Sequence, residues 1–185
     1  GSNFFLAGYR VFVKHRIPAG RTLRGLRILR SDADKRAMVW GGNMLTHYNY
    51  HLCNATVSTA DRLLSIRVRT PGALADVDIT AHIAEPDAPL PIESPFADER
   101  EARRFQGPLP YTFDYESRTN SIIRIKAMRP CWSPRLVRVD VRQLGFLNQG
   151  LLARHTPKLA SAFHVADVSY RWERGVVERL AGDAA

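Results

Sequence analysis

The segment Gly41–His51, with the sequence GGNMLTHYNYH, brings a dense group of polar and aromatic side chains together. Histidine side chains exchange protons near neutral pH, and a tyrosine hydroxyl can donate a hydrogen bond to a developing oxyanion. Asparagine amides and a second tyrosine can orient a bound carbonyl or carboxylate compound. We therefore distinguish acid–base candidates from ligand-binding candidates. The acid–base (catalytic) candidates are His47, Tyr50 and His51, and the ligand-binding candidates are Asn43, Tyr48 and Asn49.

The same segment also has a structural interpretation. Gly41 and Gly42 allow close approach of the backbone, either by a ligand or by a neighbouring strand. If the chain is extended from Tyr48 to Cys53, alternate side chains point to opposite faces, and one set points into the interior of a barrel. A hydrogen-bonded polar layer that closes the end of a barrel would use the same residue types. Both interpretations stay open at the level of the sequence.

Other chemistries have weaker support in the sequence. His47 and His51 are four residues apart, a spacing that suits two metal ligands on one helix face, but two glycines precede them and no glutamate follows His47. The chain contains no G-x-S-x-G, P-loop or G-x-G-x-x-G motif. Cys131 lies beside Trp132 between two prolines, which is typical of packing. We expect no metal site and no cofactor.

Alternation of apolar and polar residues dominates the chain and predicts strands. Residues 64–69 and 75–83 alternate in this way around the turn residues of 70–73. An antiparallel hairpin would place Arg67 and Arg69 on one face with Asp76 and Asp78, as a solvated face with ion pairs. So many strands predict a β-rich α+β fold, an antiparallel curved sheet or barrel with a few short helices. The other predicted strands are residues 4–14, 22–30, 50–58, 111–116, 120–128, 134–142 and 163–172.

Three short helices are predicted between these strands. One lies within residues 32–40, with Ser31 as its N-cap and Gly41-Gly42 at its end. A second runs from Ala97 to Phe105, and a third lies near residues 144–152. The proline-rich loop Glu85–Pro95 before the second helix is either a lid over a cavity or a rigid surface connection.

Length and composition limit the class of protein. A chain of 185 residues fits one domain, residues 1–185, and its apolar runs are far shorter than the roughly 20 residues that span a bilayer, so we expect no membrane partner. The net charge is +9, but the 23 arginines and 4 lysines are spread along the chain, and we expect no nucleic-acid partner. With two cysteines and no signal peptide, we expect a cytoplasmic location. Gly1-Ser2 suggests the remnant of a tag, with an N-terminal portion of the native chain missing.

The run from Leu23 to Val57, LRGLRILRSDADKRAMVWGGNMLTHYNYHLCNATV, resembles the YqjF-like family of uncharacterised bacterial proteins. In that family a strand pair leads into a helix and then through a Leu-x-x-Tyr-Asn-Tyr-type turn into the next strand. The later Pro110-Tyr111-Thr112 and Cys131-Trp132-Ser133-Pro134 are compatible with the same pattern. The family's opening strand and helix have no counterpart here.

That family is similar in fold to acetoacetate decarboxylase, which implies a curved-sheet barrel around a small-molecule cavity. The decarboxylase motif is Gly-aromatic-Pro-Lys-Lys, whose first lysine forms an imine with the substrate. The resemblance places Tyr48 at the aromatic, Asn49 at the proline, Tyr50 at the imine-forming lysine and His51 at the second lysine. No lysine occurs between Lys35 and Lys126, and an imine needs a primary amine. Imine-based decarboxylation is therefore not expected, although the cavity is.

Two functions follow as expectations. The first is a small-molecule binding protein or enzyme whose acetoacetate decarboxylase-like cavity takes a small organic acid or carbonyl ligand, lined by the candidates in Gly41–His51. The second is a non-catalytic interaction protein that forms a homo-oligomer through exposed strand edges of the same fold.

Overall fold

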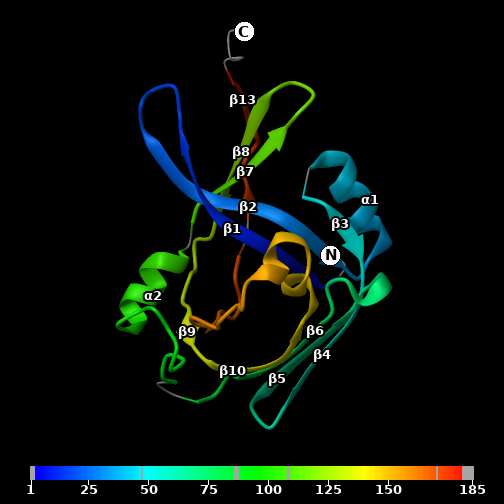
Figure 1. The fold of residues 1–185 in the computed structure, drawn as a ribbon, viewed down its shortest axis with the longest axis vertical. Coiled ribbons are helices and arrows are strands. Elements are labelled where there is room, and N and C mark those ends of the chain that lie inside the picture. Colours follow the sequence, from blue (N-terminus) through cyan, green and yellow to red (C-terminus); the bar gives the residue numbers. More distant parts are fainter. Residues whose placement is uncertain (1–2, 47, 86–87, 108, 170, 181–185) are drawn as a thin grey trace. The chain divides into compact units, whose positions relative to one another are not determined.

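The computed structural model describes residues 3–46, 48–85, 88–107, 109–169 and 171–180. Within these residues the chain forms strands β1 to β13, helices α1 and α2, and three 3-10 helices, η1 to η3 (Figure 1). This content confirms the predicted β-rich α+β class. The chain also forms two compact units of three segments each, and the assignment of residues 1–185 to one domain stays a prediction. Unit 1 consists of Gly1–Phe5, Leu52–Gly107 and Trp132–Asp167, and unit 2 of Leu6–His51, Pro108–Cys131 and Val168–Ala185.

Unit 2 is built on a curled, mixed sheet with the strand order β1-β2-β7-β8-β12, in which β3 also pairs with β2 and β13 with β8. β1 and β2 form a long, curved antiparallel hairpin (Figure 1). β2 and β7 run parallel, so the expectation of a wholly antiparallel sheet is wrong. A parallel pair needs a long connection, and the chain between these strands contains both α-helices and strands β3 to β6. The strands are β1 (Leu6–Arg16), β2 (Thr22–Ala33), β3 (Tyr50–Leu52), β7 (Tyr111–Glu116), β8 (Ser121–Met128), β12 (Arg171–Trp172) and β13 (Val176–Arg179).

The parallel contact between β2 and β7 depends on a glycine. Gly25 pairs with Tyr111 in this ladder. A Cβ atom built on Gly25 would lie 2.5 Å from the Tyr111 carbonyl oxygen and 2.5 Å from the Phe113 ring. The backbone oxygen has no freedom to move aside, so the close approach of β2 to β7 at this position requires a residue without a side chain.

Unit 1 contains a four-stranded antiparallel sheet with the order β10-β6-β5-β4. The predicted hairpin is confirmed, because Arg67 on β5 lies opposite Asp78 on β6, with a distance of 3.1 Å between Arg67 Nε and Asp78 Oδ2. Arg69 also lies 3.4 Å from Asp76, so the expected charged face exists. The strands are β4 (Asn54–Ala60), β5 (Leu63–Arg69), β6 (Val77–His82) and β10 (Arg138–Leu144), and η1 (Pro71–Ala73) connects β5 to β6.

Two predicted strands are interrupted. The expected strand 134–142 divides at Val137 into β9 (Arg135–Leu136) and β10. β10 belongs to the sheet β10-β6-β5-β4, whereas β9 pairs with β11 (Phe163–His164). Among the described residues of the expected strand 163–172, those of β11 and β12, at its two ends, are the ones that form strands. Likewise, the expected strand 50–58 divides between β3, which pairs with β2, and β4, which pairs with β5.

The first helix lies later in the chain than expected. α1 spans Arg36–Leu45, continues through Gly41 and Gly42, and is preceded by Lys35, whose side chain caps nothing. The prediction that Ser31 is its N-cap is wrong, because Ser31 is buried within β2, which extends to Ala33 by pairing with β1. The two glycines do not end the helix either, although their position suggests that they weaken or end it.

The remaining helices are short and belong to unit 1. α2 (Glu99–Gln106) confirms the predicted helix, and Asp98 is its N-cap, accepting a hydrogen bond of 2.7 Å from the Glu101 amide. The third predicted helix consists instead of two 3-10 turns, η2 (Gly145–Asn148) and η3 (Gly150–Arg154). Across the described residues, no helix combines the length and the apolar character that a bilayer crossing requires.

Each unit contains buried apolar side chains. Small residues predominate among them, as expected where strands lie close to one another. In unit 2 they include Leu23, Ala33, Phe113 and Ala127, and in unit 1 they include Val68, Val77, Ala81, Leu136 and Val137.

Candidate functional site

The connection from α1 to β3 is held by side-chain hydrogen bonds to the backbone. The Asn43 amide contacts the Tyr50 backbone twice, donating to its oxygen at 2.9 Å and accepting from its nitrogen at 2.8 Å. The Thr46 hydroxyl donates to the Gly42 carbonyl oxygen at 2.7 Å. Both ends of the Asn43 amide are engaged, so Asn43 fixes the start of β3 relative to α1. Its position here is that of a residue that orients its neighbours.

Gly42 belongs to the same connection because the Tyr50 ring packs over it. A Cβ atom on Gly42 would lie 2.4 Å from the ring of Tyr50, whereas a Cβ atom on Gly41 would meet nothing within 4 Å. The first glycine is therefore tolerated by the helix and the second is required by the ring. This explains why α1 continues through a glycine pair that the sequence suggested as its end.

Asn49 is the turn that brings the chain onto the sheet. Its φ of 51° lies in the left-handed region, which asparagine tolerates better than most residues. The strand therefore begins at Tyr50, the predicted start, and not at Tyr48. Asn49 is anchored to β2 twice. Its side-chain nitrogen Nδ2 donates to the Leu29 backbone oxygen at 3.1 Å, and its backbone oxygen accepts from the Ser31 backbone amide at 3.1 Å.

The orientation of Asn49 determines which nitrogen of His51 carries a proton. Because Asn49 Nδ2 donates to Leu29, the side-chain oxygen Oδ1 is an acceptor, and it lies 3.0 Å from His51 Nε2. His51 Nε2 must therefore carry the hydrogen. In the neutral ring the lone pair is then on Nδ1, which makes Nδ1 the proton acceptor.

A buried ion pair lies close enough to His51 to influence its charge. Arg30 and Asp32, two residues apart on β2, are joined at 2.8 Å between Arg30 Nη2 and Asp32 Oδ1, with Arg30 Nε 2.9 Å from the same oxygen. Their side chains are 8% and 0% exposed. A pair so far from water is held mainly by its own partner, so loss of either charge leaves the other buried and uncompensated.

The pKa of His51 is lowered below its ordinary value of 6.5, first by burial of the ring and then by the positive charge of Arg30, while the Asp32 carboxylate opposes this by raising it. The ring is therefore mainly neutral at physiological pH. A neutral imidazole with a defined lone pair, next to a fixed cation, can accept a proton or bind an acidic group.

Tyr48 takes a different position from the other candidates. It is buried, its hydroxyl lies 2.7 Å from the Thr112 hydroxyl on β7, and its ring centroid lies 6.3 Å from that of Trp172. Tyr48 thus contributes to the interior of unit 2. The sixth candidate, His47, lies outside the described residues.

The structure therefore brings Asn43, Asn49, Tyr50 and His51 together and adds two residues that the sequence analysis missed. The sequence places Arg30 at the end of a predicted strand and Asp32 at the start of a predicted helix. The signal that could have identified them is their spacing, because residues i and i+2 of a strand share a face and opposite charges there can pair.

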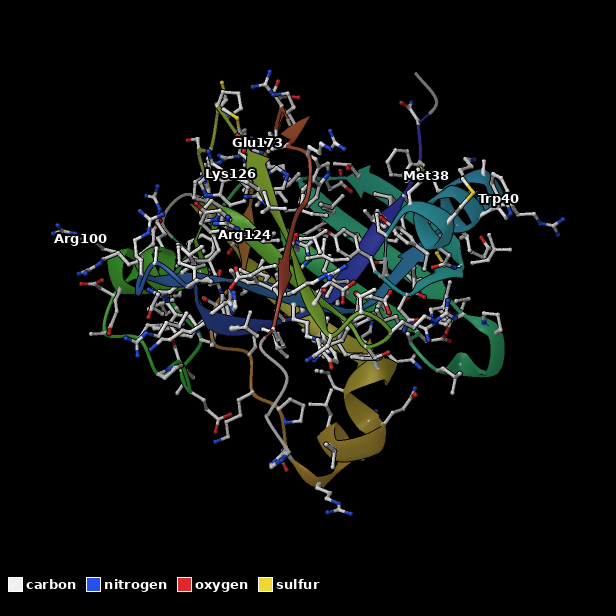
Figure 2. All side chains as sticks on the ribbon, turned by 90° about the horizontal axis from the view of Figure 1, so that it is seen from above. Met38, Trp40, Arg100, Arg124, Lys126 and Glu173 are labelled. Carbon is white, nitrogen blue, oxygen red and sulfur yellow. The ribbon has the colours of Figure 1, made fainter. Side chains whose placement is uncertain are left out.

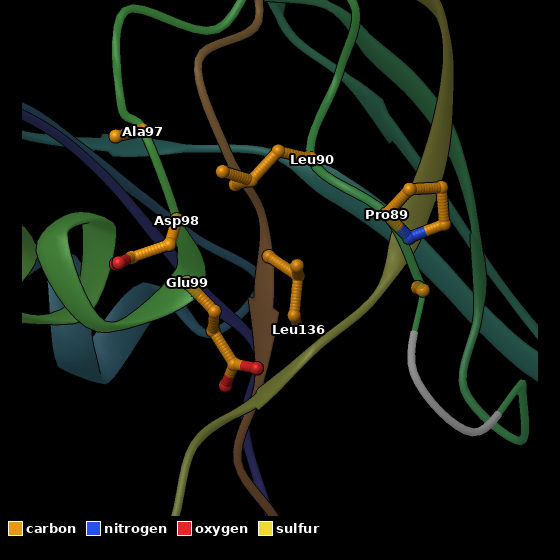
Figure 3. Close-up of a pocket in the computed structure, with 7 residues that line it drawn as sticks. Pro89, Leu90, Ala97, Asp98, Glu99 and Leu136 are labelled. Atoms are coloured by element: carbon orange, nitrogen blue, oxygen red, sulfur yellow. The ribbon is translucent and has the colours of Figure 1, made fainter.

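Pockets are present within unit 1. The proline-rich loop after β6 and the start of α2 line one of about 350 Å³, which includes Leu90, Asp98 and Leu136 (Figure 3). Its Asp98 carboxylate is engaged in capping α2. A larger pocket of about 650 Å³ lies between β10, η2 and residues 157–161. The loop thus borders a hollow, and both interpretations of it stay open.

Among the described residues, no group of three or more histidine, cysteine, aspartate or glutamate side chains is arranged to hold a metal ion. No protein-family model matches this sequence, and no curated protein matches it significantly.

Proposed function

We propose that this protein binds a small carboxylate or carbonyl compound at the start of β3 in unit 2, beside His51 and its chain neighbours Asn49 and Tyr50. The observation that carries the proposal is the His51 ring, held by Asn49 with its lone pair on Nδ1 and kept neutral by burial and by Arg30. His51 is the acid–base group, Tyr50 is the neighbouring hydrogen-bond donor, and Asn43 and Asn49 position them.

The fold belongs to the same proposal. A relation to the YqjF-like family and the acetoacetate decarboxylase-like fold is part of it, and the curled mixed sheet of unit 2 is compatible with that relation. The imine route is not part of it, because the segment contains no lysine.

The test is a titration of the protein with three probes, observed by NMR at the His51 ring nitrogens and the amides of residues 49–51. The probes are pyruvate, acetate and acetone, which separate the carboxylate from the carbonyl. We expect saturable shifts, and we expect an anionic probe to raise the pKa of His51, since an opposite charge favours the protonated ring. By linkage, affinity for that probe increases as the pH falls through the His51 pKa, which lies below 6.5.

The control is His51→Gln, which keeps a hydrogen-bonding side chain but cannot titrate. It should bind the anionic probe without the pH dependence and more weakly at low pH. Absence of any saturable shift at residues 49–51 with all three probes would refute the proposed site. A ring found protonated on Nδ1 instead of Nε2 would refute the role assigned to Asn49.

A second candidate function is self-association, favoured by the surface of α1 (Figure 2). Trp40, Met44 and Leu45 are 71%, 61% and 77% exposed, and no residue of α1 is buried. Positions four apart on a helix lie on one face, and exposed apolar faces of this kind are commonly covered by a partner. A symmetric pairing of α1 with α1 of a second copy would cover them.

Light scattering over a range of protein concentrations tests this second candidate. We expect a concentration-dependent dimer mass for the unmodified chain and a monomer mass for the Trp40→Gln/Met44→Gln variant. Arg118→Gln, at an exposed arginine in the turn between β7 and β8, is the control and should leave the dimer unchanged. A monomer mass for the unmodified chain at all concentrations would rule the pairing out.

A further inference from the structure

The pocket of about 650 Å³ in unit 1 has the size of a small-molecule site. It lies between the end of β10, η2 and residues 157–161, with Gln106 at the end of α2. The Gln106 side chain donates to the buried Ser161 hydroxyl at 2.6 Å, which ties α2 to the segment that forms the opposite wall. The walls are thus connected within unit 1, and no residue of the His51 site takes part.

The charges around this pocket have one sign. Arg142 and Lys158 are its charged lining residues, and none of the described residues that line it is an aspartate or a glutamate. The 350 Å³ pocket of the same unit differs, since Asp98 and Glu99 line it. An anion is therefore favoured in the larger pocket and disfavoured in the smaller one.

Arg142 is held in place by the sheet. Its Nε donates to Asp78 Oδ1 at 2.9 Å and its Nη2 donates to the Thr80 hydroxyl at 2.9 Å. Among the described residues, its Nη1 has no hydrogen-bond partner. Asp78 is shared with Arg67, at 3.1 Å, so two guanidinium groups face one carboxylate and a positive charge remains. Arg142 is an oriented donor that a ligand need not immobilise.

Lys158 differs because its partner can be exchanged. Its Nζ contacts Glu93 Oε1, and both side chains are more than half exposed. An exposed ion pair of this kind contributes little to stability, so Lys158 can turn from Glu93 to a bound anion at small cost.

The rest of the lining is largely apolar. Leu144 and Leu147 are half-buried, while Val141 and Leu159 are exposed to 42% and 37% although they are large apolar residues. A ligand with an aliphatic body would remove this surface from water at roughly 25 cal/mol per Å². A ligand that fits this pocket therefore combines a negative charge, for the two cations, with an apolar body, for the apolar wall.

We propose that this pocket binds a monocarboxylate with an aliphatic body, the carboxylate between Arg142 and Lys158 and the chain against Leu144, Leu147 and Leu159. The proposal is independent of the function proposed for His51, since the two sites share no residue.

Calorimetric and NMR titrations with octanoate, acetate and 1-octanol test this site, because the second probe lacks the aliphatic body and the third lacks the charge. We expect octanoate to bind more tightly than either, with shifts in the amides of residues 141–148 and 157–161. Affinity should decrease with added salt, as the charge interaction is screened.

Two variants of one ion pair provide matched controls with opposite results. Lys158→Gln should weaken octanoate about two- to fivefold, the change expected from an exposed charge pair, and Glu93→Gln, which releases Lys158, should strengthen it. His51→Gln should bind octanoate as the unmodified chain does, which separates this site from the one on unit 2. Equal binding of 1-octanol and octanoate, an unchanged affinity in Lys158→Gln, or no shift in residues 141–148 would each overturn the proposal.

Discussion

Replacement of Asp32 by alanine is expected to lower the free energy of unfolding by about 3–5 kcal/mol, the range found when one partner of a buried ion pair is removed. The Asp32 side chain is fully buried and Arg30 is 8% exposed. Without the carboxylate, the Arg30 guanidinium stays in the interior of unit 2 with its charge uncompensated. Denaturant unfolding, followed by circular dichroism, measures the change.

Two controls show whether the effect comes from the buried charge. The double variant Arg30→Met/Asp32→Leu removes both charges and should recover most of the lost stability, as replacement of buried pairs by apolar residues often does. Arg67→Gln removes a partner from an exposed pair and should cost less than about 1 kcal/mol. A loss below 1 kcal/mol in Asp32→Ala would show that the pair is not buried as described.

Single variants of the same two residues report on the candidate site. Asp32 raises the pKa of His51 and Arg30 lowers it. If Asp32→Asn folds, its His51 pKa should therefore lie below that of the unmodified chain, and that of Arg30→Met above it. NMR titration of the histidine ring measures both, and shifts in the opposite directions would contradict the electrostatic coupling of the pair to His51.

The second large effect is expected from two adjacent glycines that should respond to alanine with opposite signs. In Gly42→Ala the new Cβ atom would lie 2.4 Å from the Tyr50 ring, including atoms near its base that cannot simply rotate away. Overpacking of this kind costs about 1–3 kcal/mol. In Gly41→Ala the new Cβ meets nothing within 4 Å, and alanine favours an α-helix by about 0.5–1 kcal/mol over glycine.

Thermal and denaturant unfolding of the two variants measure the difference in sign. The Gly42→Ala variant should also shift the amide resonances of Asn43 and Tyr50, because the displaced ring disturbs their mutual hydrogen bonds. Equal effects of the two substitutions would mean that Tyr50 does not pack over α1. Stabilisation by both would mean that neither glycine is packed against Tyr50 and that both are exposed on an ordinary helix.

Local patterns explain which parts of the fold were predictable. The β5–β6 hairpin could be predicted because alternation, turn residues and opposite charges at Arg67 and Asp78 all favour the same register. The start of α1 could not, because Ser31 and Asp32 are both good helix caps and good members of a charged strand. The pairing of β2 with β1, which lies outside any local window, decided between them.

The location of the candidate site could be predicted from the sequence, but the residues that surround it could not. Asn49, Tyr50 and His51 could be selected as a dense polar group, whereas Arg30 comes from a strand some twenty residues earlier. The proximity of His51 to Arg30 depends on the positive φ of Asn49 and on its hydrogen bond to Leu29. No residue pattern in the sequence predicts such a turn. Nor does any motif indicate the unit 1 pocket, whose walls come from segments far apart in the sequence.

The division of the chain has a consequence for its synthesis on the ribosome. Each unit is assembled from three separated segments, and β8 of unit 2 takes β12 and β13 as partners only at residues 171–179. The parallel β2–β7 pair likewise can form only after some eighty intervening residues have been synthesised. Domains usually fold as they emerge, but here neither unit can be completed before most of the chain has been translated. A nascent chain arrested before residue 168 should therefore expose an unpaired edge of β8, which is a surface that a holding chaperone recognises.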